Sequence, residues 1–278
     1  MADWGKLGGS GNIEDRRGFS PMALGGGGLG IVGVAIVLIF SLLGGGSSEL
    51  DTILQQLQQP TGVQQQSAET NQFSGLDDYE QFTSTVLGSN NTVWREVFTA
   101  NNKQYKEPRL VLFRSVTQSG CGIATSDVGP HYCPADKTIY IDETFFDELK
   151  RLGGSNEDVA QAYVIAHEVG HHVQNELGTY EAVKNSGGNT NAQSVKLELQ
   201  ADCYAGIWAH SISNLGIFES GEIKEATDAA AAVGDDRIQK KVQGRITPET
   251  WTHGSSEQRV QWFNTGYTSG DPAKCDTF

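Results

Sequence analysis

The feature that most constrains this chain is an uncharged, apolar run at residues 23–43. The run holds 21 residues. At a rise of about 1.5 Å per residue, a helix of that length spans the roughly 30 Å hydrocarbon core of a bilayer. Its most apolar part is residues 29–43, because the glycines at 25–28 weaken the first turn. The run predicts one N-terminal transmembrane helix.

The charges around this run predict its orientation. Lys6, Arg16 and Arg17 precede it, whereas the next basic residue after it is Arg95. Positive residues tend to stay on the cytoplasmic side. We therefore expect a single-pass protein of the cell membrane, with its N-terminus in the cytoplasm and the rest of the chain outside. The alternative is a cleaved signal peptide, because residues 44–48 are small, although its apolar region would be rather long.

Composition divides the chain into four parts. These are a cytoplasmic tail at residues 1–22, the anchor at 23–43, a linker at 44–75 and one folded domain at 76–278. The linker is rich in Gly, Ser and Gln, so it cannot bury much apolar area. The net charge of −14 lies entirely after residue 43. A domain this acidic repels phosphate backbones, so we expect no nucleic-acid partner. The oligomeric state is left open.

Hydrophobic periodicity inside the domain predicts a small sheet followed by mostly helices, which is an α+β arrangement. Strands are expected at residues 109–116 and 138–142, with a loop at 117–136 between them. Helices are expected at residues 77–100, around 145–149, and at 156–177, 193–213, 219–233 and 256–268. Helix ends are indicated by the capping-box spacing of Ser155 with Asp158 and of Ser255 with Gln258, and by Gly178 as a stop.

The motif that carries chemistry is His167-Glu-Val-Gly-His171. Positions i and i+4 of a helix share a face, so His167 and His171 can offer nitrogen atoms to one metal ion. Glu168 is placed to take a proton from water bound to the metal rather than to bind the metal itself. This pattern arises by chance in roughly one chain in a hundred of this length. A third ligand would strengthen the interpretation.

Glu198 and Asp202 supply what such a site still lacks. A catalytic zinc site takes three protein ligands, and Glu198-Leu-Gln-Ala-Asp202 lies in a second helix with apolar periodicity. Glu198 can complete a His₂Glu site, while Asp202 accepts the second ring N–H of a liganding histidine. A solvated acidic face is the alternative, but unpaired carboxylates are costly on a buried helix. We expect one zinc ion per chain, although affinity alone would not select zinc over other divalent ions.

These residues resemble the gluzincin arrangement and, more narrowly, the bacterial putative neutral zinc metallopeptidase family. The resemblance covers nearly the whole chain except the Gln-rich linker. It rests on Glu14-Asp-Arg-Arg-Gly18, Tyr132-Cys-Pro-Ala-Asp136, His167-Glu-Val-Gly-His-His-Val-Gln174, Glu198-Leu-Gln-Ala-Asp-Cys-Tyr-Ala-Gly206 and His253-Gly-Ser-Ser-Glu-Gln-Arg259. It implies a zincin-like fold, zinc and a peptide or protein substrate. In zincins the edge strand that pairs with substrate precedes the metal helix, which points to residues 138–142; a plain core strand is the alternative.

The remaining histidines are weaker candidates. In gluzincin-like sites a later histidine or tyrosine stabilises the oxyanion, so His253 is a catalytic candidate. The alternative is an exposed histidine near a helix start. His172 points about 100° away from His171 and is expected to be structural or to support a ligand. His131 and His210 are expected not to bind metal.

The four cysteines favour neither a zinc knuckle nor a redox motif, because none forms a Cys-x-x-Cys pair. An even number is compatible with two disulfides in an oxidising compartment. The candidate pairs are Cys121 with Cys133 and Cys203 with Cys275. Four free, mostly buried thiols are the alternative.

The sequence thus predicts a membrane-anchored, zinc-dependent peptidase in which Glu168 assists the attack of zinc-bound water on a peptide bond. The alternative is a membrane-tethered binding or assembly factor of the cell envelope with a structural or latent zinc site. Glu168 favours the enzyme, because a purely structural site has no use for a base beside the first ligand. The sequence does not indicate the natural substrate.

Overall fold

The computed structural model describes residues 1–18, 71–72, 77–187 and 190–278. The predicted anchor at 23–43 and most of the predicted linker lie outside these residues. Within the described residues, no helix is long and apolar enough to cross a membrane. The part that is described belongs to one unit, which combines Met1–Arg17 with Asn71–Phe278.

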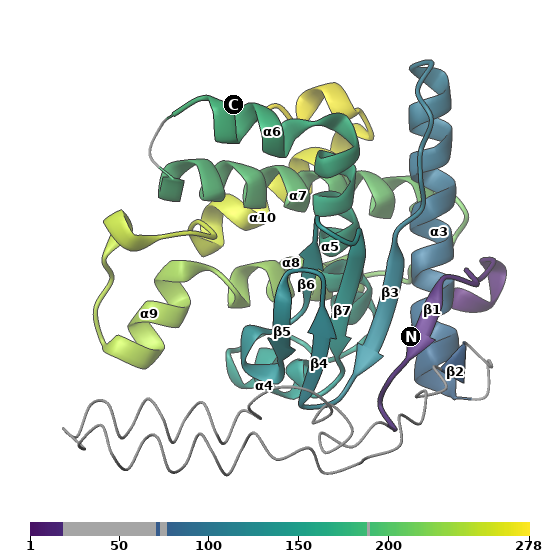
Figure 1. Ribbon diagram of the computed structural model, residues 1–278, viewed down its shortest axis with the longest axis horizontal. Coiled ribbons are helices and arrows are strands. Elements are labelled where there is room, and N and C mark those ends of the chain that lie inside the picture. Colours follow the sequence, from purple (N-terminus) through teal and green to yellow (C-terminus); the bar gives the residue numbers. More distant parts are fainter. Residues whose placement is uncertain (19–70, 73–76, 188–189) are drawn as a thin grey trace, which may run out of the picture. The chain divides into compact units, whose positions relative to one another are not determined.

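A small sheet is followed in the chain mainly by helices, which confirms the α+β class (Figure 1). The strands are β1 (Ile13–Asp15), β2 (Asn71–Gln72), β3 (Arg109–Phe113), β4 (Val116–Ser119), β5 (Gly122–Thr125), β6 (His131–Cys133) and β7 (Thr138–Asp142). The α-helices are α3 (Asp78–Ala100), α4 (Phe145–Arg151), α5 (Asp158–Leu177), α6 (Thr179–Asn185), α7 (Thr190–Ser213), α8 (Ile223–Ala232), α9 (Asp235–Gln243) and α10 (Ser256–Ser269). Short 3₁₀ turns lie at Trp4–Lys6, Ser126–Val128, Pro248–Thr250 and Pro272–Lys274.

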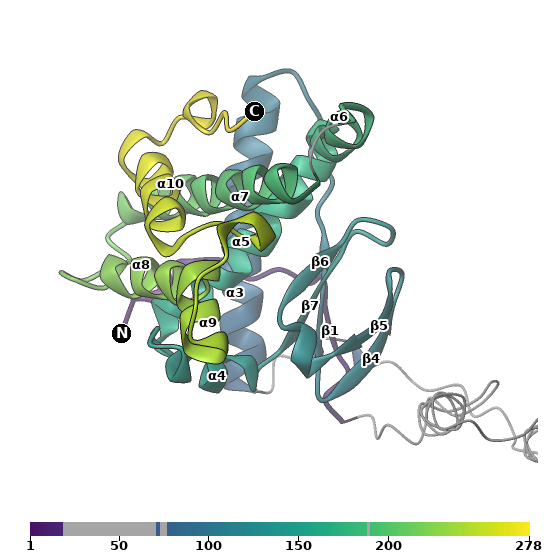
Figure 2. The same cartoon turned by 90° about the vertical axis from the view of Figure 1, so that its left-hand side faces the viewer.

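The main sheet has the strand order β2-β1-β3-β7-β6. Strands β1, β3 and β7 are parallel, whereas the outer strands β2 and β6 run antiparallel to their neighbours. The β4–β5 hairpin lies against one face of the sheet, and α3 and α5 lie against the other (Figure 2). Side chains of β3 and β7 alternate between these faces, so both strands are buried on two sides. On the helical side, the buried residues are Leu110, Leu112, Ile139 and Ile141. On the hairpin side, Val111, Phe113 and Tyr140 form a smaller cluster with Ala124 and Cys133.

Helix α5 lies at the centre of the molecule, between the sheet and a second layer of helices. Almost every residue from Val159 to Gln174 is buried. Helices α7, α8 and α10 form the second layer (Figure 2). The helix with the His-Glu-x-x-His motif is therefore held by packing against the sheet and against helices α3, α7 and α8, which fixes its two histidines.

The prediction that residues 138–142 form the edge strand is wrong. Strand β7 lies between β3 and β6, and the edge on that side is β6, within the stretch predicted as a loop. A strand of three residues is too short to show an alternating pattern, and the order of strands depends on tertiary pairing. The predicted strand at 109–116 is shorter than expected, because Ser115 has a φ of 66° and the chain turns there into the hairpin.

Met1–Arg17 pack in the same unit as Asn71–Phe278, so the folded unit includes an N-terminal segment that the sequence did not assign to it. Strand β1 of this segment pairs with β3 in the middle of the sheet. A three-residue strand and a few scattered apolar side chains carry too little signal to mark a segment as part of a core.

Most predicted helices are confirmed, but their details differ. The capping box at Ser255 is present, with both hydrogen bonds to Gln258 formed, and Gly178 ends α5 with a φ of 79°. The capping box at Ser155 is absent, since α5 begins after Glu157 without a side-chain cap. Helices α6 and α9, of seven and nine residues, were not predicted.

Candidate metal centre

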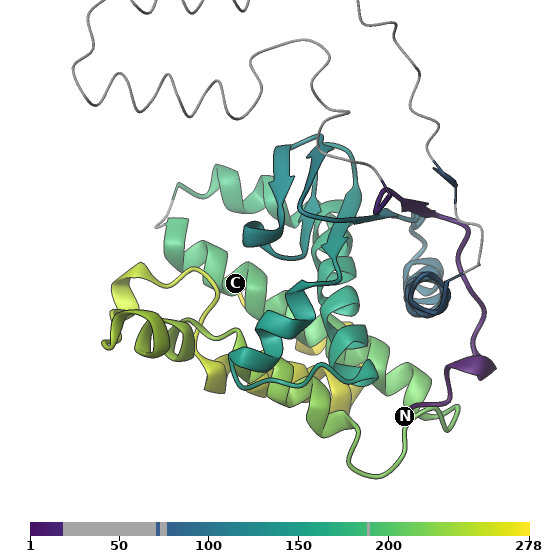
Figure 3. The same ribbon diagram turned by 90° about the horizontal axis from the view of Figure 1, so that it is seen from below.

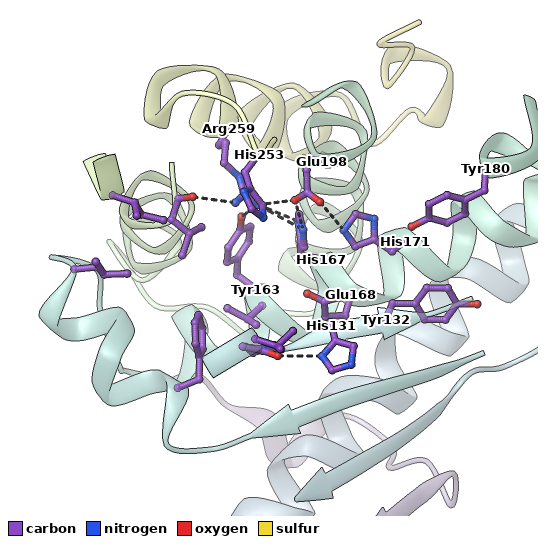
Figure 4. A pocket seen from close by; sticks show the side chains of 18 residues that line it. His131, Tyr132, Tyr163, His167, Glu168, His171, Tyr180, Glu198, His253 and Arg259 are labelled. Carbon is purple, nitrogen blue, oxygen red and sulfur yellow. Dashed lines mark hydrogen bonds and ion pairs between the residues drawn. The ribbon is translucent and has the colours of Figure 1, made fainter. Parts of the chain in front are cut away.

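The site forms where α5 and α7 cross at close range. A Cβ atom on Gly170 would lie 2.9 Å from the carbonyl oxygen of Ala201, which is closer than Cβ atoms normally come to a non-bonded atom. Glycine at this position of the motif therefore lets α7 approach α5. The close crossing brings Glu198 of α7 beside His167 and His171 of α5 (Figure 4).

Three potential ligand atoms converge at this crossing. Nε2 of His167 lies 3.2 Å from Oε2 of Glu198, and Nε2 of His171 lies 3.3 Å from Oε1 of Glu198. One ligand atom from each residue lies within 4.8 Å of the others. The structure thus brings together the three residues that the sequence predicted as metal ligands.

The second nitrogen of each imidazole is held by a neighbouring side chain. Nδ1 of His167 lies 2.8 Å from Oδ1 of Asp202, the contact that the sequence predicted. Nδ1 of His171 lies 2.9 Å from the side-chain oxygen of Gln174. With Nδ1 donating in both rings, each Nε2 is left with a lone pair that can bind a metal.

Asp202 is the centre of a buried polar network. It accepts hydrogen bonds from the Tyr163 hydroxyl at 2.5 Å and from Nε of Arg259 at 2.8 Å. Burial raises the pKa of the Asp202 carboxyl, but the Arg259 and His167 side chains outweigh burial and hold that pKa below its ordinary value. Asp202 therefore stays ionised and can orient His167.

The electrostatics of the site fit a divalent cation. Burial raises the pKa of the Glu198 carboxyl, but the two imidazoles outweigh burial and hold it well below its ordinary value. Burial lowers the pKa of His167, yet Asp202 and Glu198 together raise it to about 10. The cluster thus attracts positive charge. Two imidazoles and a carboxylate are a donor set of catalytic zinc sites.

Glu168 lies next to this donor set. Its Oε2 atom is buried and makes no hydrogen bond to any described residue. A buried carboxylate oxygen without a partner is costly in a packed domain. Its position beside the converging ligands fits an acid that exchanges a proton with a molecule bound there.

The donor set and Glu168 open into a cavity of about 490 Å³. Strand β6 contributes His131 and Tyr132 to its lining (Figure 4). Another part of the wall is apolar and consists of Val128, Phe145, Leu152, Val164, Val233 and Ile238. The cavity therefore combines a polar centre with room for an apolar group.

His253 lines the same cavity, but its side chain is 49% exposed. Its Nδ1 atom lies 3.3 Å from Oδ1 of Asp235, whose other oxygen accepts the main-chain N–H groups of Thr252, His253 and Gly254. Burial raises the pKa of the Asp235 carboxyl, but these hydrogen bonds outweigh burial and lower it overall. Asp235 therefore holds both the loop and the ring of His253.

The other histidines have structural or unrelated contacts. His172 lies between the Tyr132 hydroxyl at 3.0 Å and the carbonyl oxygen of Lys106 at 2.6 Å. His210 donates from Nδ1 to the carbonyl oxygen of Tyr267. His131 donates from Nδ1 to the carbonyl oxygen of Gly129 and stacks on Tyr140. None of them joins the converging ligands within the described residues.

The structure contains both candidate disulfides, Cys121–Cys133 and Cys203–Cys275. The described residues include no free cysteine. The first bridge closes the segment that leads into β7, and the second attaches the C-terminal end to α7.

The sequence did not reveal four residues that contribute to the site. They are Tyr163, Tyr180, Asp235 and Arg259. The hydroxyl of Tyr180 points toward His171 (Figure 4) and makes no hydrogen bond to any described residue. Tyr163 lies one turn before His167, so helical spacing could have indicated it. Arg259 ends a segment that carried the family resemblance, whereas nothing in the sequence marks Tyr180.

The fold and the site define a class of protein in which an HExxH helix and a glutamate from a second buried helix can hold one metal ion. Within that class, the chain belongs to the family described as putative neutral zinc metallopeptidase, whose model matches residues 2–278. Membership implies zinc as the metal and supports hydrolysis of peptide bonds.

Two relatives show how far the similarity extends. The chain is 43% identical over 277 residues to the uncharacterized protein YpfJ of Escherichia coli (strain K12), covering 97% of this chain and 96% of that protein. It is 43% identical over 219 residues to the uncharacterized protein Rv2575 of Mycobacterium tuberculosis (strain ATCC 25618 / H37Rv), covering 74% of this chain and 73% of that protein. No solved structure matches the chain.

Proposed function

We propose that this chain is a zinc-dependent peptidase that acts outside the cytoplasm and is attached to the membrane through residues 23–43. The observation that carries the proposal is Glu168. Its buried carboxylate has an oxygen without a hydrogen bond to any described residue and lies beside the converging side chains of His167, His171 and Glu198. A structural metal site needs no such group.

The side chains around the cavity can take different roles in peptide hydrolysis. A zinc ion held by His167, His171 and Glu198 would polarise a carbonyl and lower the pKa of water to about 7. Glu168 accepts a proton from the attacking water and passes it to the leaving amine. Tyr180 and His253 can donate hydrogen bonds to the negative charge that develops on the carbonyl oxygen.

The edge strand beside the cavity supports an extended peptide as substrate. Strand β6 is the edge of the sheet beside the cavity, and it pairs only with β7 among the described strands. A substrate strand can add to such an edge through main-chain hydrogen bonds. The apolar wall that includes Phe145 and Ile238 can take a large apolar side chain next to the scissile bond.

The two disulfides support the proposed compartment. Bridges of this kind persist in oxidising surroundings and are rare in the cytoplasm. Cys133, Cys203 and Cys275 are buried, so these bonds are part of the folded core. The apolar run at 23–43 supports attachment to the membrane.

The test combines metal content with proteolysis on the purified full-length chain. We expect wild type and Glu168→Gln each to bind one zinc ion. Peptide cleavage by Glu168→Gln should fall about 10²- to 10⁴-fold, because only the proton acceptor is lost. Glu181→Gln, an exposed change on α6, serves as the matched control and should keep full activity.

Two outcomes would argue against the proposal. Unchanged cleavage by Glu168→Gln would exclude Glu168 as the catalytic base. If wild type binds zinc and cleaves none of a broad set of peptides with large apolar residues, the envelope binding factor becomes the better explanation.

A further inference from the structure

The N-terminal segment is an integral part of the described unit. In β1, Ile13 aligns with Leu110 and Asp15 with Leu112, so the segment is a full member of the sheet. Main-chain hydrogen bonds to β3 continue beyond both ends of β1. The Leu110 N–H donates to the Asn12 carbonyl at 2.9 Å, and the Arg16 N–H donates to the Leu112 carbonyl at 2.7 Å. Without β1, strand β3 would lose the partner on this side and expose these groups.

Helix α3 packs directly against the backbone of this segment. A Cβ atom on Gly88 would lie 2.4 Å from the carbonyl oxygen of Gly8, so the two backbones touch. Next to it, the Ser84 hydroxyl donates to the Ser10 carbonyl at 2.8 Å and accepts from the Ser10 N–H at 3.0 Å. The segment runs alongside α3 (Figure 3). Both serines are buried, so these polar groups depend on the segment for their hydrogen bonds.

Trp4 docks on the helices that carry the candidate metal ligands. Its ring packs on Phe82 at 5.4 Å and stacks on Trp208 of α7 at 6.5 Å between centroids. Its indole N–H donates to Asp158, the first residue of α5, at 2.8 Å, and so does the Ala2 N–H at 2.9 Å. The segment therefore contacts both α5 and α7.

The basic residues of the segment are all bound to the same unit. The Arg17 side chain is only 9% exposed, and its guanidinium lies within 3.1 Å of carboxylates of Asp15, Asp77 and Glu143. Arg16 pairs with Glu14 at 2.7 Å and donates to the Gln118 carbonyl at 2.9 Å. Lys6 donates to the Gly216 carbonyl. The basic residues that predicted a cytoplasmic N-terminus thus form ion pairs and hydrogen bonds within the folded unit.

From this packing we propose that residues 1–17 and the rest of the unit in which they pack lie on the same side of the membrane. The chain leaves the unit after Arg17 and re-enters it at Asn71. One crossing between these points would place the two parts on opposite sides. Residues 44–70 contain no second apolar run of spanning length that could return the chain. The proposal does not depend on peptidase activity.

Thiol labelling of the full-length chain in intact cells tests the sidedness. Asn12→Cys places a thiol at an exposed position of the N-terminal segment, and Lys241→Cys places one at an exposed position of α9. A membrane-impermeant maleimide should modify both single variants to the same extent, before and after the membrane is permeabilised. Modification of one variant from outside and of the other only after permeabilisation would overturn the proposal.

A cross-link tests the packing itself. The side chains of Asn12 and Glu107 meet at 3.2 Å on the surface, so Asn12→Cys with Glu107→Cys should be bridged by dibromobimane, which becomes fluorescent when it joins two thiols. Each single variant is the control and should stay dark. Absence of a bridge in a folded double variant would overturn the proposal; if the double variant does not accumulate, the sidedness of the single variants decides.

The same labelling experiment tests this proposal independently of the proposed location of the domain outside the cytoplasm. If both single variants are modified only after permeabilisation, the two parts still share one side, but the domain faces the cytoplasm. That result would support the present proposal and contradict the proposed location of the peptidase.

Discussion

The Tyr180 hydroxyl points into the candidate metal centre and has no hydrogen-bond partner among the described residues (Figure 4). Burial raises its pKa, and the carboxylates of Glu198 and Glu168 raise it further, so the group remains a proton donor at neutral pH. Losing one donor to a developing oxyanion costs about 10²- to 10³-fold in kcat. We expect Tyr180→Phe to lower kcat by about 100-fold while zinc content stays the same.

Steady-state kinetics on zinc-loaded protein would measure this effect. Tyr267→Phe is the matched control, because Tyr267 stacks on Phe263 in α10 and should keep wild-type kcat. A drop in melting temperature or zinc content as large as the drop in kcat would instead assign Tyr180 a structural role.

Spacing along a helix explains which site residues the sequence could reveal. His167, Glu168 and His171 lie within one turn, so their relative positions follow from helix geometry alone. Glu198 was predicted because a catalytic zinc site needs a third ligand. Arg259 was not, since its contact with Asp202 depends on how α10 packs on α7. A buried carboxylate requires a counter-charge, which is the physical signal that could have led to it.

At the scale of helices, α7 and α10 touch through two glycines. A Cβ atom on Gly266 would lie 1.9 Å from the carbonyl oxygen of Cys203, and one on Gly206 would lie 2.1 Å from the carbonyl oxygen of Phe263. Because these obstacles are backbone atoms, an added methyl group forces the helices apart. We expect Gly266→Ala to reduce the free energy of unfolding by about 3 kcal/mol.

Chemical denaturation would test the glycine contact, with Gly11→Ala as control. A Cβ atom on Gly11 meets nothing within 4 Å, so that variant should unfold like wild type. Separation of the helices should also weaken zinc binding, because α7 carries Glu198 and α10 carries Arg259. Wild-type stability of Gly266→Ala would mean that the helices can separate at little cost.

The loop before α10 depends on an ionised Asp235. Hydrogen bonds from His253 and Gly254 outweigh burial and lower its pKa. A lowered folded-state pKa stabilises the protein above the unfolded value of about 3.9, and that stability is lost as the pH falls through the folded value. We expect Asp235→Asn to cost about 2 kcal/mol at pH 7 and to lose less stability than wild type on acidification below about pH 4.

Thermal unfolding between pH 7 and pH 3 would test this expectation, with Asp228→Asn on α8 as control. Asp228 pairs with Lys224, and its side chain is 44% exposed, so its loss should matter little. Parallel stability curves for wild type and Asp235→Asn across this range would show that Asp235 is not the group that titrates.

Element length decides how much of the secondary structure the sequence could predict. Helices α3, α5 and α10 have several turns of regular apolar spacing and clear ends, and they were predicted within two residues. Strands β1, β2 and β6 have two or three residues, which is too few for a period to appear. The position of these strands depends on pairing within the sheet, so the edge strand could not be predicted from the residues around it.

At the scale of the whole molecule, composition predicted the fold class but did not reveal that the N-terminal segment pairs with the sheet. A charged segment before an apolar run normally indicates a tail and an anchor. Here Arg17 pairs with Asp77 and Glu143, two carboxylates that are far from it in the sequence. Charge partners that are distant in sequence become visible only when the fold is known.

The Cys203–Cys275 bridge connects the stability of the whole molecule to its metal centre. It joins cysteines 72 residues apart, whereas Cys121–Cys133 joins cysteines 12 apart. In the chain-entropy model, these bridges stabilise the fold by about 4.5 and 3 kcal/mol, respectively. We expect replacement of Cys203 and Cys275 by alanine to lower the melting temperature more than replacement of Cys121 and Cys133.

The two double variants should differ further in zinc affinity. The Cys275 carbonyl accepts a hydrogen bond from Gln200 at 2.9 Å, and Gln200 accepts one from Gln174, whose oxygen holds Nδ1 of His171. Loosening the C-terminal end should therefore disturb His171, and loss of such support costs about 10- to 100-fold in metal affinity. Competition with a chelator would measure this loss, for which Cys121→Ala with Cys133→Ala is the matched control. Equal zinc affinity in both double variants would show that Gln200 and Gln174 hold His171 in place without the Cys203–Cys275 disulfide. A larger loss in the Cys203 and Cys275 variant would make an oxidising compartment a requirement of the metal centre as well as of the fold.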